Sequence, residues 1–298
     1  MRTSARWSGV ILAATLAVAA SAGLAAQAIQ RALYVSVLDR AGVPVAGLGP
    51  ADFIVREDRV AREVLRVGPA DEPMQIALLV DNSQAAEGYI RDYREALPAF
   101  VAAMTEPGGP RHEVSLVALA ERPTILSRYT SDRAELLKAV ERVFSLSGSA
   151  TYLLDGIIET SQGLIKRAAP RPVIVAITSE GPELSDRHFE QVLTPLETSG
   201  AALHVVSIGR PANLDHDRGV VLDRGTKGSG GRYDTILLGT ALTARMKEIA
   251  RELNSQYLVT YARPKTLIPP ERITVAAATP GLTARGTAVR GDREERRP

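Results

Sequence analysis

Apolar residues are arranged in two alternating patterns between Gln75 and Tyr261. Continuous apolar runs, typical of parallel strands buried on both faces, alternate with stretches in which apolar residues recur every three or four positions, as on one face of a helix. The expected strands are 76–80, 114–119, 173–177, 202–208 and 257–261, with a short strand at 124–126 pairing back beside 114–119. The expected helices are 90–104, 136–144, 154–165, 185–196 and 242–253. This order predicts an α/β fold with a doubly wound, mostly parallel sheet and helices on both faces.

The segments around this core have a different texture. The polar stretch 209–231 has little periodicity and predicts a loop. Residues 29–70 predict a strand at 33–38 and a hairpin of 53–56 with 60–65, and residues 263–290 return to short β patterns. Such short segments bury little core alone, so we expect the two to pack together beside a domain at 71–262. The charged end, 291–298, predicts a disordered tail.

Residues 1–28 have the layout of a secretory signal peptide. Arg2 and Arg6 precede an apolar run, and small residues compatible with cleavage follow it. The alternative is an uncleaved membrane anchor, because the apolar stretch 9–26 is long enough to span a bilayer. No later stretch has that length, so we expect no membrane span after signal removal and a secreted or periplasmic protein.

Composition removes several classes of function. The chain has no cysteine, which excludes disulfides, thiolate metal sites and cysteine nucleophiles. Its 36 basic and 34 acidic residues become 34 of each without the signal segment, so no basic surface for nucleic acid is expected. Aromatic residues make up 4%, which argues against a stacking platform for bases or sugars.

Ligands of open α/β sheets bind at the carboxyl ends of the strands, so the loops there carry the candidate chemistry. The first core strand is not followed by the glycine pattern of dinucleotide enzymes, and the chain has neither a P-loop nor a G-x-S-x-G motif. Its four histidines have no paired, metal-binding spacing. These observations disfavour the common nucleotide-binding and hydrolytic sites.

Oxygen-bearing side chains remain at this edge. Asp81 and Ser83 follow the first core strand, Thr151 precedes the third helix, and polar residues follow 173–177. Carboxylate and hydroxyl oxygens suit a hard cation such as Mg²⁺. The alternative is structural: Asp81 and Ser83 would close a strand-to-helix turn, and Thr151 would be a helix N-cap.

These residues resemble the metal-ion-dependent adhesion site of the von Willebrand factor type A domain. That family has D-x-S-x-S after its first strand, Thr before its third helix and Asp after its fourth strand; Asp81, Ser83 and Thr151 match. Ala85 stands where the family has its second Ser, and the Asp position falls on Ser179 or, with a slip of one residue, on Glu180. The motif is therefore degenerate. The segments 37–45 and 252–261 resemble bacterial secreted proteins called VWFA-related.

The resemblance implies an exported, non-enzymatic protein-interaction or adhesion module. Its partner would be a protein in the cell envelope or outside the cell, bound at the rim formed by the loops after Val80, before Thr151 and after Ile177. Asp81, Ser83 and Thr151, with Glu180 as a further candidate, would bind Mg²⁺ weakly, because the degenerate motif offers few ligands. The alternatives are a metal-dependent hydrolase using Asp81 or Glu180, and a structural envelope component without a rim ligand.

Overall fold

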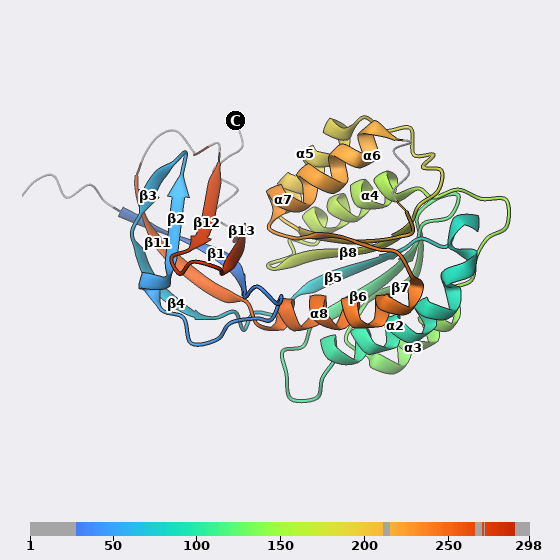
Figure 1. The fold of residues 1–298 in the computed structure, drawn as a ribbon, viewed down its shortest axis with the longest axis horizontal. Helices are drawn as coiled ribbons and strands as arrows, with labels where there is room; N and C mark the ends of the chain where they lie inside the picture. Colours follow the sequence, from blue (N-terminus) through green and yellow to red (C-terminus); the bar gives the residue numbers. More distant parts are fainter. Residues whose placement is uncertain (1–27, 211–214, 266–269, 271, 290–298) are drawn as a thin grey trace, which may run out of the picture.

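The computed structural model of the chain describes residues 28–210, 215–265, 270 and 272–289. Its larger part is an α/β domain built on a six-stranded sheet of order β10-β9-β8-β5-β6-β7 (Figure 1). Neighbouring strands are parallel except at β6 and β7, which are antiparallel as predicted. The strands are β5 (Gln75–Val80), β6 (Glu113–Ala118), β7 (Thr124–Thr130), β8 (Pro172–Ser179), β9 (Ala202–Ile208) and β10 (Tyr233–Ile236). This is the mixed α/β fold with a mostly parallel sheet that the sequence predicts.

Helices cover both faces of this sheet. Because side chains alternate along a strand, Ile76 and Leu78 of β5 face one apolar cluster, and Ala77 and Leu79 face the other. The first cluster is closed by α2 (Ile90–Met104), α3 (Arg133–Glu141) and α8 (Leu242–Asn254). The second is closed by α4 (Leu153–Lys166) and α5 (Phe189–Ser199). Double coverage explains why these strands are continuous apolar runs in the sequence.

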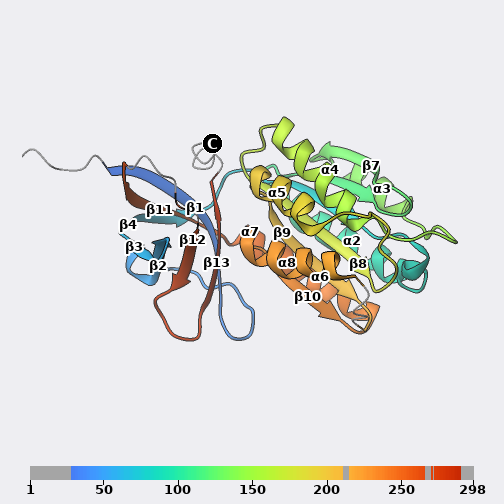
Figure 2. The ribbon, with the colours of Figure 1, turned by 90° about the horizontal axis from the view of Figure 1, so that it is seen from above.

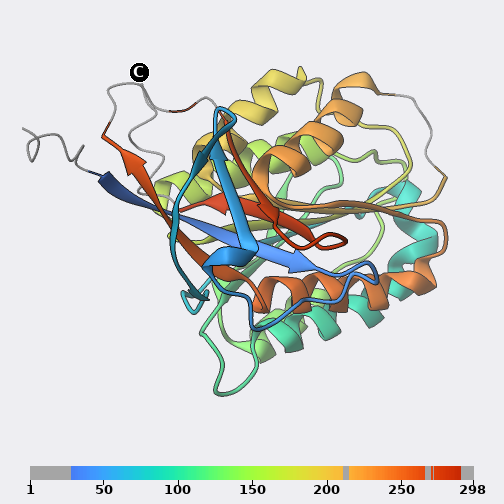
Figure 3. The same ribbon diagram turned by 60° about the vertical axis from the view of Figure 1, so that its left-hand side comes forward.

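A smaller β unit lies beside the α/β domain (Figures 1 and 2). One sheet has the order β13-β1-β11-β4 and the other the order β12-β2-β3, and their apolar side chains form a third core (Figure 3). The strands are β1 (Ala28–Leu38), β2 (Phe53–Glu57), β3 (Val60–Arg62), β4 (Val64–Pro69), β11 (Tyr257–Pro264), β12 (Ile273–Ala277) and β13 (Thr283–Ala288). Strands from both ends of the chain thus share two sheets.

The prediction that 257–261 is the last strand of the α/β sheet is wrong. β11 lies between β1 and β4 in the β unit, with Tyr34 opposite Leu258. Its large apolar residues alternate, so that Tyr257, Val259 and Tyr261 all face the third core. Alternation is the pattern of a strand with a single covered face, unlike the continuous runs of the α/β sheet. The edge of that sheet is instead β10, whose mostly polar sequence gave no strand signal.

Three further boundaries differ from the predictions. The expected loop 209–231 contains α6 (His216–Val220), a π-helical turn (Val221–Gly225) and α7 (Thr226–Ser229). The pattern missed them because glycines interrupt the segment, although Gly225 packs tightly against Leu193, Leu196 and Leu203. α5 begins at residue 189 rather than near 185, and α3 ends at residue 141. Asp132 is the N-cap of α3, since its side chain accepts hydrogen bonds from the Ala134 and Glu135 N–H groups.

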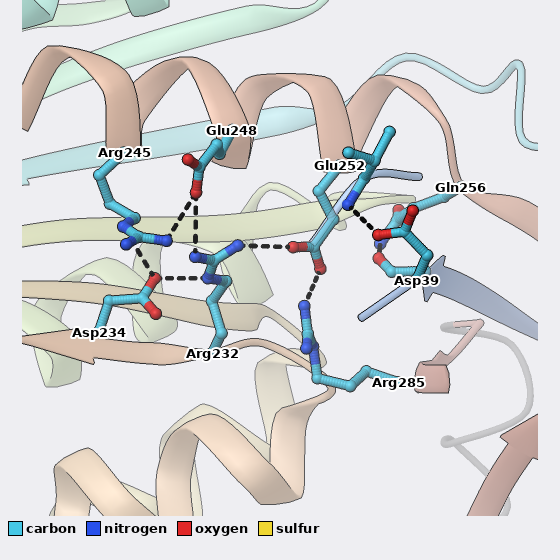
Figure 4. Close-up of polar contacts among 10 residues, drawn as sticks. Asp39, Arg232, Asp234, Arg245, Glu248, Glu252, Gln256 and Arg285 are labelled. Carbon is cyan, nitrogen blue, oxygen red and sulfur yellow. Dashed lines mark hydrogen bonds and ion pairs between the residues drawn. The ribbon is translucent and has the colours of Figure 1, made fainter. Parts of the chain in front are cut away.

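A network of charges around the buried Glu252 holds the β unit against the α/β domain (Figure 4). Glu252, near the end of α8, is 1% exposed and accepts from Arg232 at 3.3 Å and from Arg285 of β13 at 2.5 Å. Arg232 also pairs with Asp234 and Glu248. We call these residues the junction network: Arg232, Asp234, Arg245, Glu248, Glu252 and Arg285.

Arg171 reinforces the same junction. Its guanidinium donates to the carbonyl oxygens of Ala70, Glu72 and Leu253, so it binds both connections between the units. It also lies 4.9 Å from the centre of the Tyr34 ring of β1. The β unit is thereby attached at the amino-terminal edge of the sheet, and the carboxyl-terminal edge faces away from it (Figure 1).

Two predictions concern parts of the chain outside the described residues. These are the signal segment 1–28, of which the structure describes only residue 28, and the tail 291–298. Within the described ranges, no helix has the length and apolar character needed to cross a membrane.

Candidate functional site

Three loops meet at the carboxyl-terminal edge of the α/β sheet. The N–H of Thr151 donates to the carbonyl of Pro182 at 3.1 Å, and the N–H of Leu184 donates to the carbonyl of Thr151 at 3.0 Å, which joins the loop before α4 to the loop after β8. The N–H of Gln84 donates to the carbonyl of Ser149 at 3.3 Å and joins in the loop after β5. The structure therefore brings Asp81, Ser83 and Thr151 to one edge, which we call the rim.

Asp81 is fully buried at the centre of the rim, and both its carboxylate oxygens accept hydrogen bonds. Oδ1 accepts from the N–H of Ser83 at 2.9 Å. Oδ2 accepts from the N–H and the hydroxyl of Ser179, at 2.9 and 2.7 Å. The bond from the Ser83 N–H closes a turn after β5, which is the structural role that the sequence analysis gave as the alternative to metal binding. The second pair ties the end of β5 to the end of β8.

The negative charge of Asp81 affects a neighbouring phenol. Tyr93 of α2 is fully buried, and its pKa is raised well above the usual value, first by burial and then by the charge of Asp81. A neutral Tyr93 therefore lies close to the carboxylate. Tyr93 lies in the helix expected at 90–104, and its sequence pattern gave no sign of a place near the rim.

Ser179 rather than Glu180 stands beside Asp81. Glu180 is directed toward β9 instead: its carboxylate accepts from the hydroxyl of Ser207 and pairs with Arg218 at 3.3 Å. Because β9 and β5 flank β8 on opposite sides, this conformation takes the Glu180 carboxylate away from the side of Asp81.

Arg218 is a part of the rim that the sequence analysis missed. It belongs to α6, is 7% exposed, and lies 3.4 Å from the carbonyl oxygen of Ser179 and 3.5 Å from the hydroxyl of Thr178. The available signal was Asp215, which caps α6 by accepting from the Arg218 N–H at 2.9 Å. An aspartate before a short helix was hidden in a segment read as a loop.

The prediction that Thr151 is a helix N-cap, kept as the structural alternative, is wrong. The first N–H groups of α4 are satisfied instead by Glu183, which accepts from Leu153, and by Ser185, which accepts from Asp155, both at 3.1 Å. The hydroxyl of Thr151 is buried and makes no hydrogen bond with any residue that the structure describes. An unpaired buried hydroxyl is unfavourable, so this group is available to a ligand or to water.

At Ala85, where the family motif has a hydroxyl, the loop after β5 lies very close to the loop after β8. A Cβ built on Gly181 would lie 2.5 Å from the Cβ of Ala85, so the loops after β5 and β8 touch here. Glycine is needed at 181 because a side chain there would push the loops apart. The small residue Ala85 thus belongs to a closed contact.

Several large apolar side chains are exposed at this end of the α/β domain. They lie in the loops at or near the rim: Phe144 is 58% exposed, Leu184 56%, Leu237 63% and Leu238 68%. The sequence analysis placed Phe144 on a helix face, but α3 ends before it, and Asn82 donates to its carbonyl oxygen. These four residues could have been identified from the sequence, because they are apolar but do not fit the period of a helix or a strand.

The donor set at the rim does not fit a divalent cation. A hard dication needs several oxygen ligands and carboxylates to balance its charge. Asp81 already accepts three hydrogen bonds, Ser179 replaces a second acid, and Glu180 is paired with a guanidinium. Across the described ranges, no group of three or more His, Asp or Glu side chains is arranged to hold a metal ion.

Comparison with known protein families identifies the α/β domain. Residues 76–182, from β5 through β8 and into the following loop, match the model of the von Willebrand factor type A domain. This part of the chain is a von Willebrand factor type A domain. The match contains Asp81, Ser83 and Thr151 and ends before Arg218.

Solved structures contain the same fold at low sequence identity. Proximal thread matrix protein 1 of the mussel byssus superposes with a TM-score of 0.51 and 14% identity, over 67% of this chain and 50% of that one. This chain thus matches about half of that protein's length. A further structure of it has zinc in its metal-ion-dependent adhesion site.

Two bacterial structures are also similar. A von Willebrand factor type A protein from Catenulispora acidiphila matches with a TM-score of 0.48 and 12% identity, over 88% of this chain and 74% of that one. The corresponding domain of the type V pili tip protein Mfa5 from Porphyromonas gingivalis matches with a TM-score of 0.47 and 13% identity, over 62% of this chain and 96% of that one. Among curated proteins, none is significantly similar to this sequence.

Proposed function

We propose that this chain is a non-enzymatic protein-interaction module that binds a partner protein at the rim of its type A domain. The observation that carries the proposal is the group of exposed apolar side chains, Phe144, Leu184, Leu237 and Leu238, around a buried polar centre. Exposed apolar groups rimmed by polar residues mark surfaces that bind other proteins. The type A fold, whose members typically mediate protein interactions, supports the same conclusion.

The placement of the rim supports this proposal. The β unit covers the opposite edge of the sheet, where the junction network fixes it, so the rim is presented at the far end of the molecule (Figure 2). A partner would bury the four apolar side chains, and its polar groups would reach the hydroxyl of Thr151. Asp81 and Ser83 shape the floor of this surface.

Enzymatic activity is not part of the proposal. A hydrolase at the rim would need a carboxylate with an oxygen available for a metal or for a proton. The oxygens of Asp81 are used by Ser83 and Ser179, and the Glu180 carboxylate is held by Ser207 and Arg218. These contacts favour a rigid binding surface over a reactive one.

We further propose that the protein acts outside the cytoplasm, as an adhesion or envelope component. The support is the sequence of residues 1–28, with two arginines, an apolar run and small residues at its end. The division into residues 29–70, 71–262 and 263–290 is likewise a proposal, except that β11 (Tyr257–Pro264), which begins within the second segment, pairs with strands of the β unit.

Photo-crosslinking tests the proposed binding surface. A photoreactive amino acid at Leu238 of the full chain, expressed in the native cell, should crosslink to a discrete partner. The same amino acid at Val60 is the matched control, since Val60 is also apolar and exposed but lies in β3 of the β unit. A partner found equally from both positions, or from neither, contradicts binding at the rim.

A charge substitution provides the second arm. A chain without the photoreactive amino acid should capture the partner that crosslinking has identified. Leu237→Asp/Leu238→Asp should abolish this capture, and Val60→Asp should not. Both variants should fold, because all three side chains are largely solvent-exposed. Retention of the partner by the double variant would exclude the apolar rim as the binding surface.

A further inference from the structure

The residues around Asp81 differ in charge from an intact metal-ion-dependent adhesion site. The family motif, D-x-S-x-S with a Thr and a second Asp, supplies two acidic side chains and three hydroxyl side chains to the metal site. Here Ser179 and Ala85 remove one acid and one hydroxyl. The structure adds a positive charge, since the guanidinium of Arg218 lies against Ser179 and Thr178.

Arg218 is held in place by several independent contacts. Its Nη1 is 3.3 Å from Glu180 Oε2, its Nη2 is 3.4 Å from the Ser179 carbonyl oxygen, and both charged side chains are less than a tenth exposed. Its backbone N–H is fixed by Asp215 at the start of α6. Breaking a buried ion pair of this kind is costly, because each charge would then be buried without its partner.

The pair has two effects on a cation approaching Asp81. It directs the Glu180 carboxylate toward β9, so this carboxylate does not complete a ligand set with Asp81. The Arg218 guanidinium also compensates the charge of Glu180, so this carboxylate adds no net negative charge that would attract a dication. Both effects act against metal binding, and the closed contact of Ala85 with Gly181 removes space for a third ligand.

We propose that Arg218 is the resident cation of the rim, and that the Arg218–Glu180 ion pair replaces a divalent metal and excludes it. The rim is therefore a metal-independent variant of the type A binding site. This goes beyond the proposed function and does not rest on it, because metal binding can be measured on the protein alone.

The first test uses the unmodified full chain and Mn²⁺, which is detected by electron paramagnetic resonance and by isothermal titration calorimetry. We expect no saturable Mn²⁺ binding at millimolar metal, and no change in melting temperature with Mn²⁺, Mg²⁺ or chelator. Saturable binding below millimolar concentration, lost in Asp81→Ala, would overturn the proposal without bearing on partner binding. No substitution is needed for this outcome to be decisive.

The second test restores the family motif in two backgrounds. Ala85→Ser/Ser179→Asp supplies the missing hydroxyl and acid but keeps the ion pair. The same variant with Arg218→Gln removes the guanidinium charge and leaves the Glu180 carboxylate without its ion-pair partner Arg218. We expect Mn²⁺ binding in the second protein at least about tenfold tighter than in the first, as removal of a nearby like charge requires.

Two outcomes of the second test are informative beyond affinity. Equal Mn²⁺ affinity in the two restored proteins would show that Arg218 does not exclude metal, and would overturn its assignment. Arg218→Gln alone is the folding control, because the Glu180 carboxylate keeps its hydrogen bond from the hydroxyl of Ser207. If it fails to fold, the binding test on the unmodified chain still decides the proposal.

Discussion

Two buried carboxylates lie at opposite edges of the same sheet, and different kinds of hydrogen-bond donor stabilise them. Asp81 at the rim accepts from neutral groups, the N–H groups of Ser83 and Ser179 and a serine hydroxyl. Glu252 at the junction accepts from two guanidinium groups, those of Arg232 and Arg285. Neutral donors fix a loop locally, whereas guanidinium groups on other elements join parts of the molecule that are distant in sequence. The first edge is built to present loops and the second to hold two units together.

The most damaging change at the junction should be the loss of the charge on Glu252. In Glu252→Gln, Arg232 and Arg285 lose their common counter-ion in a buried site, and we expect about 3 kcal/mol lower unfolding free energy. Urea denaturation measures this. The matched control is Asp223→Asn, which breaks the exposed pair with Lys227 and should cost less than about 0.5 kcal/mol. Equal effects of the two substitutions would mean that burial does not strengthen the junction.

His204 makes the junction sensitive to acid. It is fully buried on β9, both its ring nitrogens have no hydrogen-bond partner among the described residues, and burial lowers its pKa to about 4. Near it are the charges of Glu252, Arg285, Arg232 and Asp234. The unfolded chain binds this proton near pH 6.5 and the folded chain does so only near pH 4. Stability should therefore fall as pH drops through this window, by about 3 kcal/mol.

His204→Leu checks that sign. The variant keeps an apolar side chain of similar size but has no group to protonate, so this part of the pH dependence should disappear. Unfolding free energies of the two proteins at several pH values between 7 and 4 would show it. His112 is retained in both proteins, so only the contribution of His204 differs between them. If the variant and the wild type lose stability in parallel, the acid sensitivity arises elsewhere.

Ser179 provides the corresponding test at the rim. Ser179→Ala removes the hydroxyl that donates to Asp81 but keeps the backbone N–H bond, so we expect a loss of about 1.5 kcal/mol. Thermal unfolding monitored by circular dichroism measures it. Ser149→Ala is a suitable control, because that hydroxyl donates to the carbonyl of Leu146 in the same group of loops. A loss as large as that of Glu252→Gln would remove the distinction between the two edges.

The smallest effect on stability is expected at the exposed apolar residues. Phe144→Ser should change the unfolding free energy by less than about 0.5 kcal/mol, because the side chain is mostly in solvent. It should nevertheless weaken partner capture, which the crosslinking assay measures. A strongly destabilised Phe144→Ser would show that this residue supports the fold rather than binding.

Sequence patterns predicted elements with strong periodicity and failed where tertiary contacts decide. The strands β5, β8 and β9 were clear because burial on both faces requires continuous apolar runs. β11 was assigned to the wrong sheet, although its alternating Tyr257, Val259 and Tyr261 indicate a strand with one covered face. α6 was missed because a short glycine-interrupted helix has no period long enough to detect.

The candidate site was predictable to a similar extent. Asp81, Ser83 and Thr151 could be brought together from the rule that parallel strands end at one edge. The choice between Ser179 and Glu180 beside Asp81 could not, since it depends on which way a side chain turns at the end of β8. Arg218 could not be foreseen either, because its contact with Glu180 spans 38 residues and joins the loop after β8 to α6.

The shared β unit has a consequence for the order of folding. Gln256 donates to Ser36 across 220 residues of sequence, and β1 pairs with strands made at the end of synthesis. The type A domain is continuous in sequence and can fold as soon as it leaves the ribosome, whereas β1 to β4 must wait for β11 to β13. During that interval β1 carries two unpaired edges. The late closure of the β unit is then the slow, aggregation-sensitive step in the biogenesis of this protein.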